Sequence, residues 1–146
     1  MLSNSCRYGI RAVVYIASQD KANGNIGIKK ISESLDLPTP YLAKILQQLA
    51  KNKILLSAKG PNGGFSMLRD PKKISLLNIV EIIDGNDFFN NCIFHNGTCT
   101  YVDSQKIPCP IHDEFGKVRS DLINMFSNTT IYDLATKAVD TGAILI

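Results

Sequence analysis

Three cysteines and one histidine in the second half of this 146-residue chain could together bind a soft metal centre. The cysteines are Cys92, Cys99 and Cys109, with six and nine residues between them, and His112 lies three positions after the last. The C-x-x-C pairs of a zinc ribbon are not in the sequence, so the common zinc pattern fits poorly. Thiolates select iron–sulfur clusters, zinc or cuprous ions. The spacing therefore leaves a cluster, a zinc ion and free redox-active thiols as alternatives.

The segment that carries the three cysteines, 86–110, has no sustained apolar periodicity. Loops of this length are uncommon in compact domains unless they are disordered or functional, and an enclosed ion would supply the missing order. His95 lies in the same loop and is the second candidate for a nitrogen ligand, although a solvated loop histidine is the simpler interpretation. Cys6 lies in a predicted helix, where we expect a small buried residue rather than a ligand.

Residues 28–69 are the part of the chain that the remaining elements must support. Two apolar stripes with helical spacing are separated by Leu37-Pro38, and they predict two short helices with a tight connection. The stripes are Ile28, Ile31 and Leu35, then Leu42, Ile45, Leu46 and Leu49. Thr39 is expected to cap the second helix, with Pro40 at its first position. Strand-like residues 54–56 and 65–68 follow, joined by a glycine-rich loop. The pattern predicts a mainly α fold with a small β-hairpin wing, a winged helix–turn–helix.

The polar face of the second helix is suited to a DNA major groove, because it offers cations for phosphates and amides or a phenol for base edges. Residues 1–73 contain 12 Lys or Arg and 4 Asp or Glu, whereas residues 74–146 contain 4 and 9. A net charge of +3 therefore hides a basic half suited to a polyanion. The alternative is an ordinary α+β domain whose polar helix face is only solvated. The expected DNA contacts are Thr39, Tyr41, Lys44, Gln47 and Lys51 of the helix, and Lys59, Gly60 and Asn62 of the wing; Gln48 shares the polar face.

Further helices are predicted on both sides of this region. Residues 4–18 are predicted to form a helix with one apolar face. Ser75 can cap a further short helix that ends before Gly85. Thr130 and Asp133 have the spacing of a capping box at the start of the last helix. Before it, Phe115, Val118, Leu122, Met125 and Phe126 form one stripe. We interpret this long helix as a dimer contact, since helix–turn–helix proteins usually need two reading heads; a helix packed on its own domain is the alternative.

The stretch LPTPYLAKILQQLAKNKILLSAKGPNGGFSMLRDP resembles the DNA-binding core of the Rrf2 family of bacterial transcription regulators. The Tyr41-Leu42 opening of the recognition helix and the Gly-Pro-x-Gly-Gly-aromatic wing carry the likeness, and Tyr8-Gly9-Ile10-Arg11 matches the family's first helix. Members carry Arg where this wing has Lys59, which implies a weaker or less shape-selective minor-groove contact.

The resemblance implies an iron–sulfur cluster, because members of the cluster-binding branch hold one with three cysteines of this same loop. One branch adds a histidine three residues after the third cysteine, which His112 matches. Another uses an aspartate of the partner's first helix, where this chain has Arg7, which cannot ligate. The implied ligands are Cys92, Cys99, Cys109 and His112, with a 2Fe–2S cluster favoured over 4Fe–4S and zinc as the alternative.

The sequence also limits the other classes of function. No apolar run approaches the ~20 residues that span a bilayer, and Arg7 and Arg11 interrupt any signal-peptide core. We therefore expect a cytoplasmic protein with thiol or ligand cysteines. Neither a G-x-S-x-G, a P-loop nor an H-E-x-x-H motif is present, and a Cys109–His112 catalytic pair has no neighbouring oxyanion hole in the sequence, so we do not expect an enzyme.

These observations predict a homodimeric transcription regulator, a repressor, on a pseudo-palindromic operator in double-stranded DNA. The expected parts are a DNA-binding domain at 1–85, a cluster-binding loop at 86–112, and a dimerisation helix with a C-terminal helix at 113–146. Through the cluster the protein would sense iron–sulfur status, redox state or nitric oxide. The alternatives are a cluster-free thiol- or zinc-dependent regulator of this fold, or a regulator controlled by a protein partner.

Overall fold

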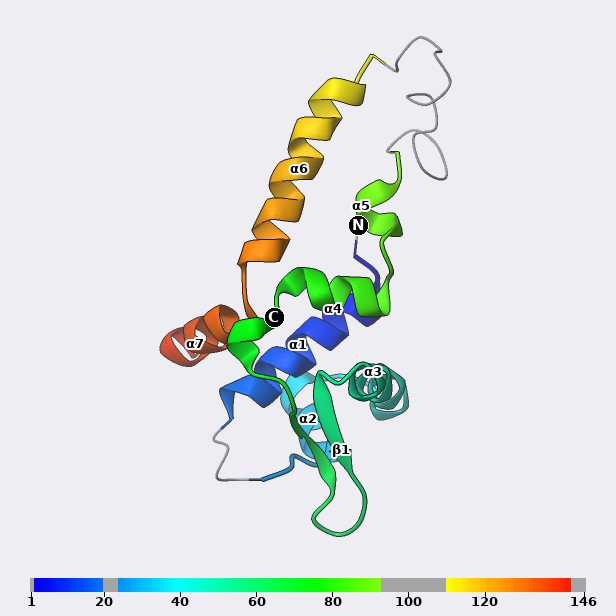
Figure 1. Cartoon of the computed structure of the whole chain (residues 1–146). Coiled ribbons are helices and arrows are strands. Elements are labelled where there is room, and N and C mark those ends of the chain that lie inside the picture. Colours follow the sequence, from blue (N-terminus) through cyan, green and yellow to red (C-terminus); the bar gives the residue numbers. More distant parts are fainter. Residues whose placement is uncertain (1, 20–23, 93–109, 143–146) are drawn as a thin grey trace.

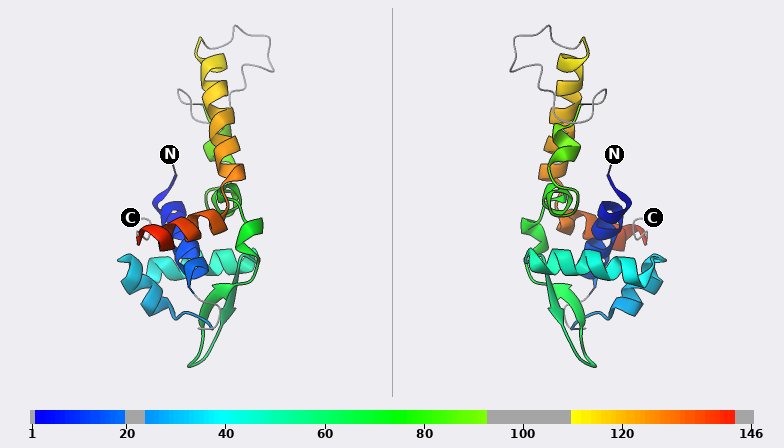
Figure 2. Two further views of the ribbon diagram at one scale, coloured as in Figure 1. Left: turned by 90° about the vertical axis from the view of Figure 1, so that its left-hand side faces the viewer. Right: turned by 90° about the vertical axis from the view of Figure 1, so that its right-hand side faces the viewer.

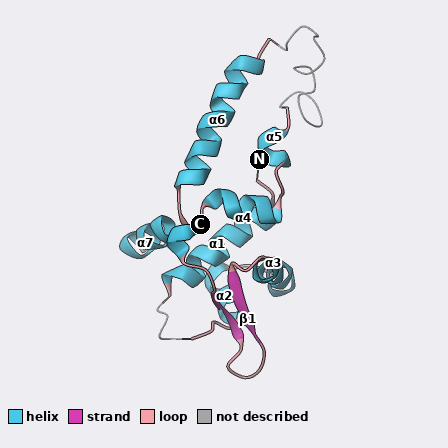
Figure 3. Ribbon diagram, in the orientation of Figure 1, coloured by secondary structure: helices cyan, strands magenta, loops and turns pink. Residues whose placement is uncertain are grey.

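A computed structural model describes residues 2–19, 24–92 and 110–142 of the chain (Figure 1). Helices predominate, and the strands form one antiparallel hairpin (Figure 3). The elements are α1 Asn4–Ser18, α2 Ile28–Leu35, α3 Thr39–Lys51, β1 Leu55–Ala58, β2 Gly64–Met67, the 3-10 turn η2 Pro71–Lys73, α4 Leu76–Ile83, α5 Asp87–Asn90, α6 His112–Asn128 and α7 Ile131–Thr141. The order helix, turn, helix, hairpin confirms the predicted winged helix–turn–helix.

The connection between α2 and α3 forms as the sequence suggests, with one correction. Asp36 has a left-handed backbone (φ 51°), which ends α2, and Pro38 keeps the chain extended before α3 begins. Pro38, not Thr39, is the N-cap residue, so the predicted cap was one position too late. The Thr39 hydroxyl is instead 2.8 Å from the hydroxyl of the buried Ser32, and this contact joins α2 to α3.

The wing is a short hairpin whose root is pinned to the body of the protein. Leu55 pairs with Met67, and Phe65 also bridges to Ile26, so a third extended segment borders β2. Gly64 has φ +138°, and a Cβ there would lie 2.2 Å from the Ile26 carbonyl oxygen. Only glycine fits this close approach of two backbones, which gives a physical reason for the second glycine of the Gly-Gly pair.

One hydrophobic core unites α1, α2, α3, the wing and α7, and we call this unit, with η2 and α4, the body. The last helix returns onto α1, and its Ile131, Ala135 and Ala138 are buried in this core. Thr130 and Asp133 form the predicted capping box. Ser75 likewise caps α4 together with Asn78, so the starts of α4 and α7 are fixed by local hydrogen bonds.

Helices α5 and α6 lie side by side and project from the body; we call them the arm (Figures 1 and 2). The short α5 was not predicted, because 86–110 was interpreted as loop throughout. The arm meets the body in a second, small cluster made by Cys6, Val80, Phe89 and Phe126. The Phe89 and Phe126 rings, from α5 and α6, contact edge to face with centroids 5.6 Å apart.

The predicted apolar stripe of α6 divides between two faces. Phe126 is buried and Leu122 packs against the small cluster, whereas Val118 and Met125 are 61% and 51% exposed. Part of the stripe therefore holds the arm to its own body, and the rest faces outward. Within the described ranges, no helix is long and apolar enough to cross a bilayer.

Candidate functional site

The polar face of α3 and the wing border an open groove of about 710 Å³, which is closed on its third side by the start of α2. Gln47 lines this groove from α3, and its side-chain amide lies 3.4 Å from the hydroxyl of Ser57 on β1. Lys59 and Gly60 line it from the wing. The recognition helix and the wing thus share one surface, as a helix in a major groove and a hairpin on the neighbouring backbone require.

The predicted cations lie on exposed positions of this surface. Lys44 and Lys51 are exposed on α3, and Lys59 is exposed where the chain leaves β1. Gly60 has φ +100°, a backbone that favours glycine, and Asn62 is exposed beyond it. The backbone carbonyl of Asn62 accepts a long hydrogen bond (3.4 Å) from the Asn25 amide, so the far side of the wing is tied to the segment before α2.

Besides Gln47, three polar residues of α3 have intramolecular partners instead of facing only solvent. Thr39 is half-buried on Ser32, as described above. The Tyr41 hydroxyl is 2.8 Å from the Ser5 hydroxyl of α1. Gln48 donates from Nε2 to the Ile82 carbonyl of α4 at 2.6 Å. The sequence pattern could not distinguish these residues from their neighbours, because their partners lie 7 to 36 residues away.

Lys29 is a groove residue that the sequence analysis missed. It lies in the first turn of α2 and lines the groove opposite the wing. Gly27, which has no side chain to cap α2, lies beside it. Free amides and a cation at a helix start favour an anion such as a phosphate. The Lys29-Lys30 pair, two residues after Gly27, was the available sequence signal.

The structure describes two of the four predicted metal ligands, and both lie where the arm ends. Cys92 is half-buried shortly after α5, and His112 is the half-buried first residue of α6. Cys99, Cys109 and His95 lie outside the described residues. Among the described residues, no three His, Cys, Asp or Glu side chains form a group that could hold a metal. Cys92 and His112 flank 93–109, which contains the other two cysteines.

Cys6 is fully buried between the body and the arm, as predicted for a small apolar residue. Burial, with a smaller contribution from the charge of Asp84, raises the pKa of its thiol to about 12. A thiol that stays protonated is a poor metal ligand and a poor nucleophile. Cys6 is therefore part of the packing that joins arm and body.

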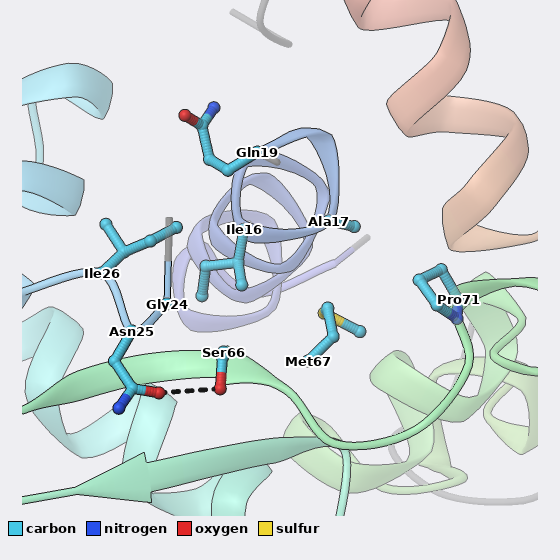
Figure 4. A pocket seen from close by; sticks show the side chains of 9 residues that line it. All are labelled: Ile16, Ala17, Gln19, Gly24, Asn25, Ile26, Ser66, Met67 and Pro71. Carbon is cyan, nitrogen blue, oxygen red and sulfur yellow. Dashed lines mark hydrogen bonds between the residues drawn. The ribbon is translucent and has the colours of Figure 1, made fainter. Parts of the chain in front are cut away.

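A separate cavity of about 260 Å³ lies between the end of α1, β2 and Pro71 (Figure 4). None of its described lining residues is charged. The Ser66 hydroxyl donates to the Asn25 side chain at 2.9 Å on its floor. The cavity contains none of the residues predicted for DNA or metal binding.

Known proteins match nearly the whole chain. A model of the Rrf2 family, described as iron-dependent transcriptional regulators, matches residues 2–137. The chain belongs to the Rrf2 family. An HTH-type transcriptional regulator of Aquifex aeolicus is 30% identical over 136 residues, 92% of this chain and 90% of the relative. IscR of Escherichia coli, also an HTH-type transcriptional regulator, is 25% identical over 133 residues, 91% and 78% of the two chains.

The fold is also that of solved Rrf2 structures. CymR, the global cysteine regulator of B. subtilis, superposes with a TM-score of 0.78 at 20% identity, covering 94% of this chain and 97% of its own. An Rrf2 protein is a transcriptional regulator, not an enzyme, and regulators of the family bind DNA. The groove between α3 and the wing is the candidate surface for this DNA binding.

Proposed function

We propose that this Rrf2 regulator is a homodimeric repressor that senses iron–sulfur status, redox state or nitric oxide through a 2Fe–2S cluster. The ligands would be Cys92, Cys99, Cys109 and His112. The observation that carries the proposal is the position of Cys92 and His112 at the end of the arm, on either side of 93–109. The family description as iron-dependent regulators supports it.

The donor set suits such a cluster chemically. Three thiolates are soft, anionic ligands, and a neutral imidazole in place of a fourth raises the reduction potential of the cluster. When bound, the cluster would supply iron that reacts with oxidants or nitric oxide and is lost when iron is scarce. Arg119 of α6 donates from Nη2 to the Asn91 carbonyl at 3.2 Å, which holds the backbone next to Cys92 against α6.

The outward face of α6 is the proposed dimer contact. Val118 and Met125 are seven residues apart on one helix face and are both exposed. Exposed large apolar side chains in a row commonly mark a protein interface. We propose that α6 of a second copy covers them, so that two recognition helices face a pseudo-palindromic operator. Replacement of Val118 by Asp should then yield monomers in analytical ultracentrifugation, and Asn124→Asp, on another exposed face of α6, should not.

On DNA, the proposed contacts are divided by chemistry. Lys44, Lys51 and Lys59 would bind phosphates, with Gly60 and Asn62 bringing the wing backbone close. Gln47, exposed in the groove, would read a base edge. Thr39 remains a proposed contact, although its hydroxyl is paired with Ser32, whereas the predicted DNA contact of the Tyr41 hydroxyl competes with its bond to Ser5. The proposed division is DNA binding by 1–85, cluster binding by 86–112 and dimerisation by 113–146, in the cytoplasm where the DNA is.

The test is anaerobic reconstitution of the wild-type chain and of single variants. Wild type should gain visible absorption, iron and acid-labile sulfide, and its affinity for DNA should change. Cys92→Ala, Cys99→Ala and Cys109→Ala should each lose the cluster, because a thiolate contributes charge and a strong bond. His112→Ala should form a cluster that decays faster, and His112→Cys should retain it at a lower reduction potential. His95→Ala is the matched control.

Three results would contradict parts of the proposal. If His95→Ala loses the cluster and His112→Ala retains it, the fourth ligand is His95 and not His112. Bound zinc with no sulfide would favour the zinc-dependent alternative. Cys→Ala variants that equal wild type in colour, metal content and DNA response would leave a regulator without a metal sensor.

A further inference from the structure

Tyr41, at the start of the recognition helix, is held by two specific contacts with α1. Its hydroxyl is 2.8 Å from the Ser5 hydroxyl, and its ring meets the Tyr8 ring edge to face, with centroids 5.9 Å apart and planes at 81°. Tyr41 is nevertheless 45% exposed. Core packing of Leu42 places the first turn of α3, and the two contacts of Tyr41 add a specific tie between that turn and the start of α1.

The same turn of α1 also contacts the arm and α4. Cys6, next to Ser5, is fully buried against Phe89 and Phe126 of the arm. Ser3, which caps α1, donates from its backbone amide to the Asp84 carboxylate at the end of α4, at 2.9 Å, and its hydroxyl donates to the same carboxylate. The first turn of α1 is therefore the place where the arm, α4 and the recognition helix meet.

A second tether holds the last part of α3. Gln48 donates to the Ile82 carbonyl of α4 at 2.6 Å. Helix α4 contributes Val80 to the small cluster that receives the arm. The recognition helix is thus tied near both of its ends to the two body helices on which the arm rests. Side chains locked by packing and hydrogen bonds position a binding surface more closely than free ones do.

We infer that Tyr41 is a positioning residue. Through Ser5 it sets the orientation of α3 on DNA, and it links that orientation to the arm. The link to the arm rests on the proposed function, whereas the positioning role does not. A chain of packed side chains and hydrogen bonds is the physical path that such coupling requires. The competing role for Tyr41 is a direct contact of its hydroxyl with DNA, which would not involve Ser5.

A double-mutant cycle distinguishes these roles. The variants are Ser5→Ala, Tyr41→Phe and the double variant, all as the full chain without a bound metal. Affinity is measured for a duplex that wild type selects from a random library and for a random-sequence duplex of equal length. Each single variant should lower the ratio of the two affinities by about 2- to 10-fold, the effect of one hydrogen bond. The double variant should lose no more than either single variant.

Two controls separate positioning from a general loss of structure. Ser5→Thr keeps a hydroxyl and should restore the ratio. Tyr15→Phe removes a similar pair, in which the Tyr15 and Ser34 hydroxyls are 3.0 Å apart and join α1 to α2 away from α3; the ratio should stay at the wild-type value. If Ser5→Ala leaves the ratio unchanged while Tyr41→Phe lowers it, or if the two losses add, Tyr41 is a direct DNA contact and the inference is wrong.

The link to the arm has its own readout. The response is the DNA affinity of the cluster-loaded protein divided by the DNA affinity of the unloaded protein. Tyr41→Phe should bring this ratio closer to one than it is in wild type. An unchanged response in Tyr41→Phe would overturn the link while leaving the positioning role intact. If wild type forms no cluster at all, the proposed sensor fails, and the cycle in the unloaded protein still decides the role of Tyr41.

Discussion

The body and the arm are held together by very different amounts of apolar contact. The body core draws buried side chains from α1, α2, α3, the wing and α7. The arm is joined by one small cluster in which Phe89 and Phe126 meet Cys6 and Val80. Segments with few buried contacts open at lower free energy than the core does. The comparison teaches that a well-packed winged helix–turn–helix and a segment held by few buried contacts coexist in one short chain.

Phe126→Ala should have the largest effect, because it should loosen the arm while leaving the body intact. Removal of a buried aromatic ring costs about 3–5 kcal/mol in a core. The cost should fall on the arm, because Phe126 contacts the small cluster rather than the body core. Hydrogen exchange should accelerate throughout α6 while α2 and α3 remain protected. Asn124→Ala, at an exposed position close to Phe126, is the control and should leave exchange in both the arm and the body unchanged. Faster exchange in α3 of Phe126→Ala would show that arm and body unfold as one unit.

Gly9→Ala should disturb the packing of α1 against α3 and α4. A Cβ at this buried position would lie 2.3 Å from Cδ1 of Ile83 on α4 and 3.1 Å from Cγ2 of Ile45 on α3. Overpacking costs about 1–3 kcal/mol, and the gain of about 1 kcal/mol from Ala over Gly inside a helix offsets part of it, so thermal unfolding should show a modestly lower Tm. Ile83→Val removes the nearer methyl, so the double variant should regain much of the loss. If the losses of stability in Gly9→Ala and Ile83→Val simply add in the double variant, the contact between these two residues is not the source of the strain.

Charge should matter for DNA on the body and not on the arm. With Lys59→Ala the slope of log affinity against log salt should become shallower by about 1 for each wing, since one phosphate contact is lost. Lys117, which lies on the arm and contacts Glu114 at 3.3 Å, is a matched exposed lysine. Its replacement by Ala should leave the slope unchanged. Equal slopes for both variants and wild type would remove the wing from the DNA contacts.

The smallest expected effect concerns Cys6, at the junction. Its pKa is raised to about 12 from an ordinary 9.0, chiefly by burial. As the pH rises above 9 the unfolded chain ionises at this position before the folded chain does, so the free energy of unfolding should fall. Urea titrations between pH 8 and 10 would measure this fall, which Cys6→Ala should reduce. Rapid alkylation of Cys6 in the native protein at neutral pH would instead show that the junction is open.

Much of the body could be predicted from the sequence because its signals are local. The Leu42/Ile45/Leu46/Leu49 stripe is buried as its spacing predicts, and the caps at Ser75 and Thr130 depend on residues three positions away. The stripe of α6 was predicted less completely. Its periodicity identified a helix, but it could not tell that Leu122 and Phe126 face the arm junction while Val118 and Met125 face outward.

The candidate site was less predictable, because the contacts that distinguish its residues come from segments distant in the sequence. Exposure of Lys44 and Gln47 follows from helical periodicity alone. The partners of Tyr41 and Gln48 come from α1 and α4, so helical spacing could not separate proposed DNA contacts from residues that bond to the body. Lys29 was missed because its role arises only when α2 is folded beside the wing. The ligand set at 92–112 stays a prediction, since two of its cysteines lie outside the described residues.

The backbone contact at Gly64 has a consequence for the design of altered DNA preferences. A side chain at Gly64 would meet the Ile26 carbonyl, and one at Gly63 would lie 2.5 Å from the Ala58 carbonyl oxygen. Randomised libraries of the wing should therefore keep both glycines and vary Lys59, Pro61 and Asn62, which are exposed. Selection from such a library would sample recognition chemistry, because few of its members would be lost to misfolding.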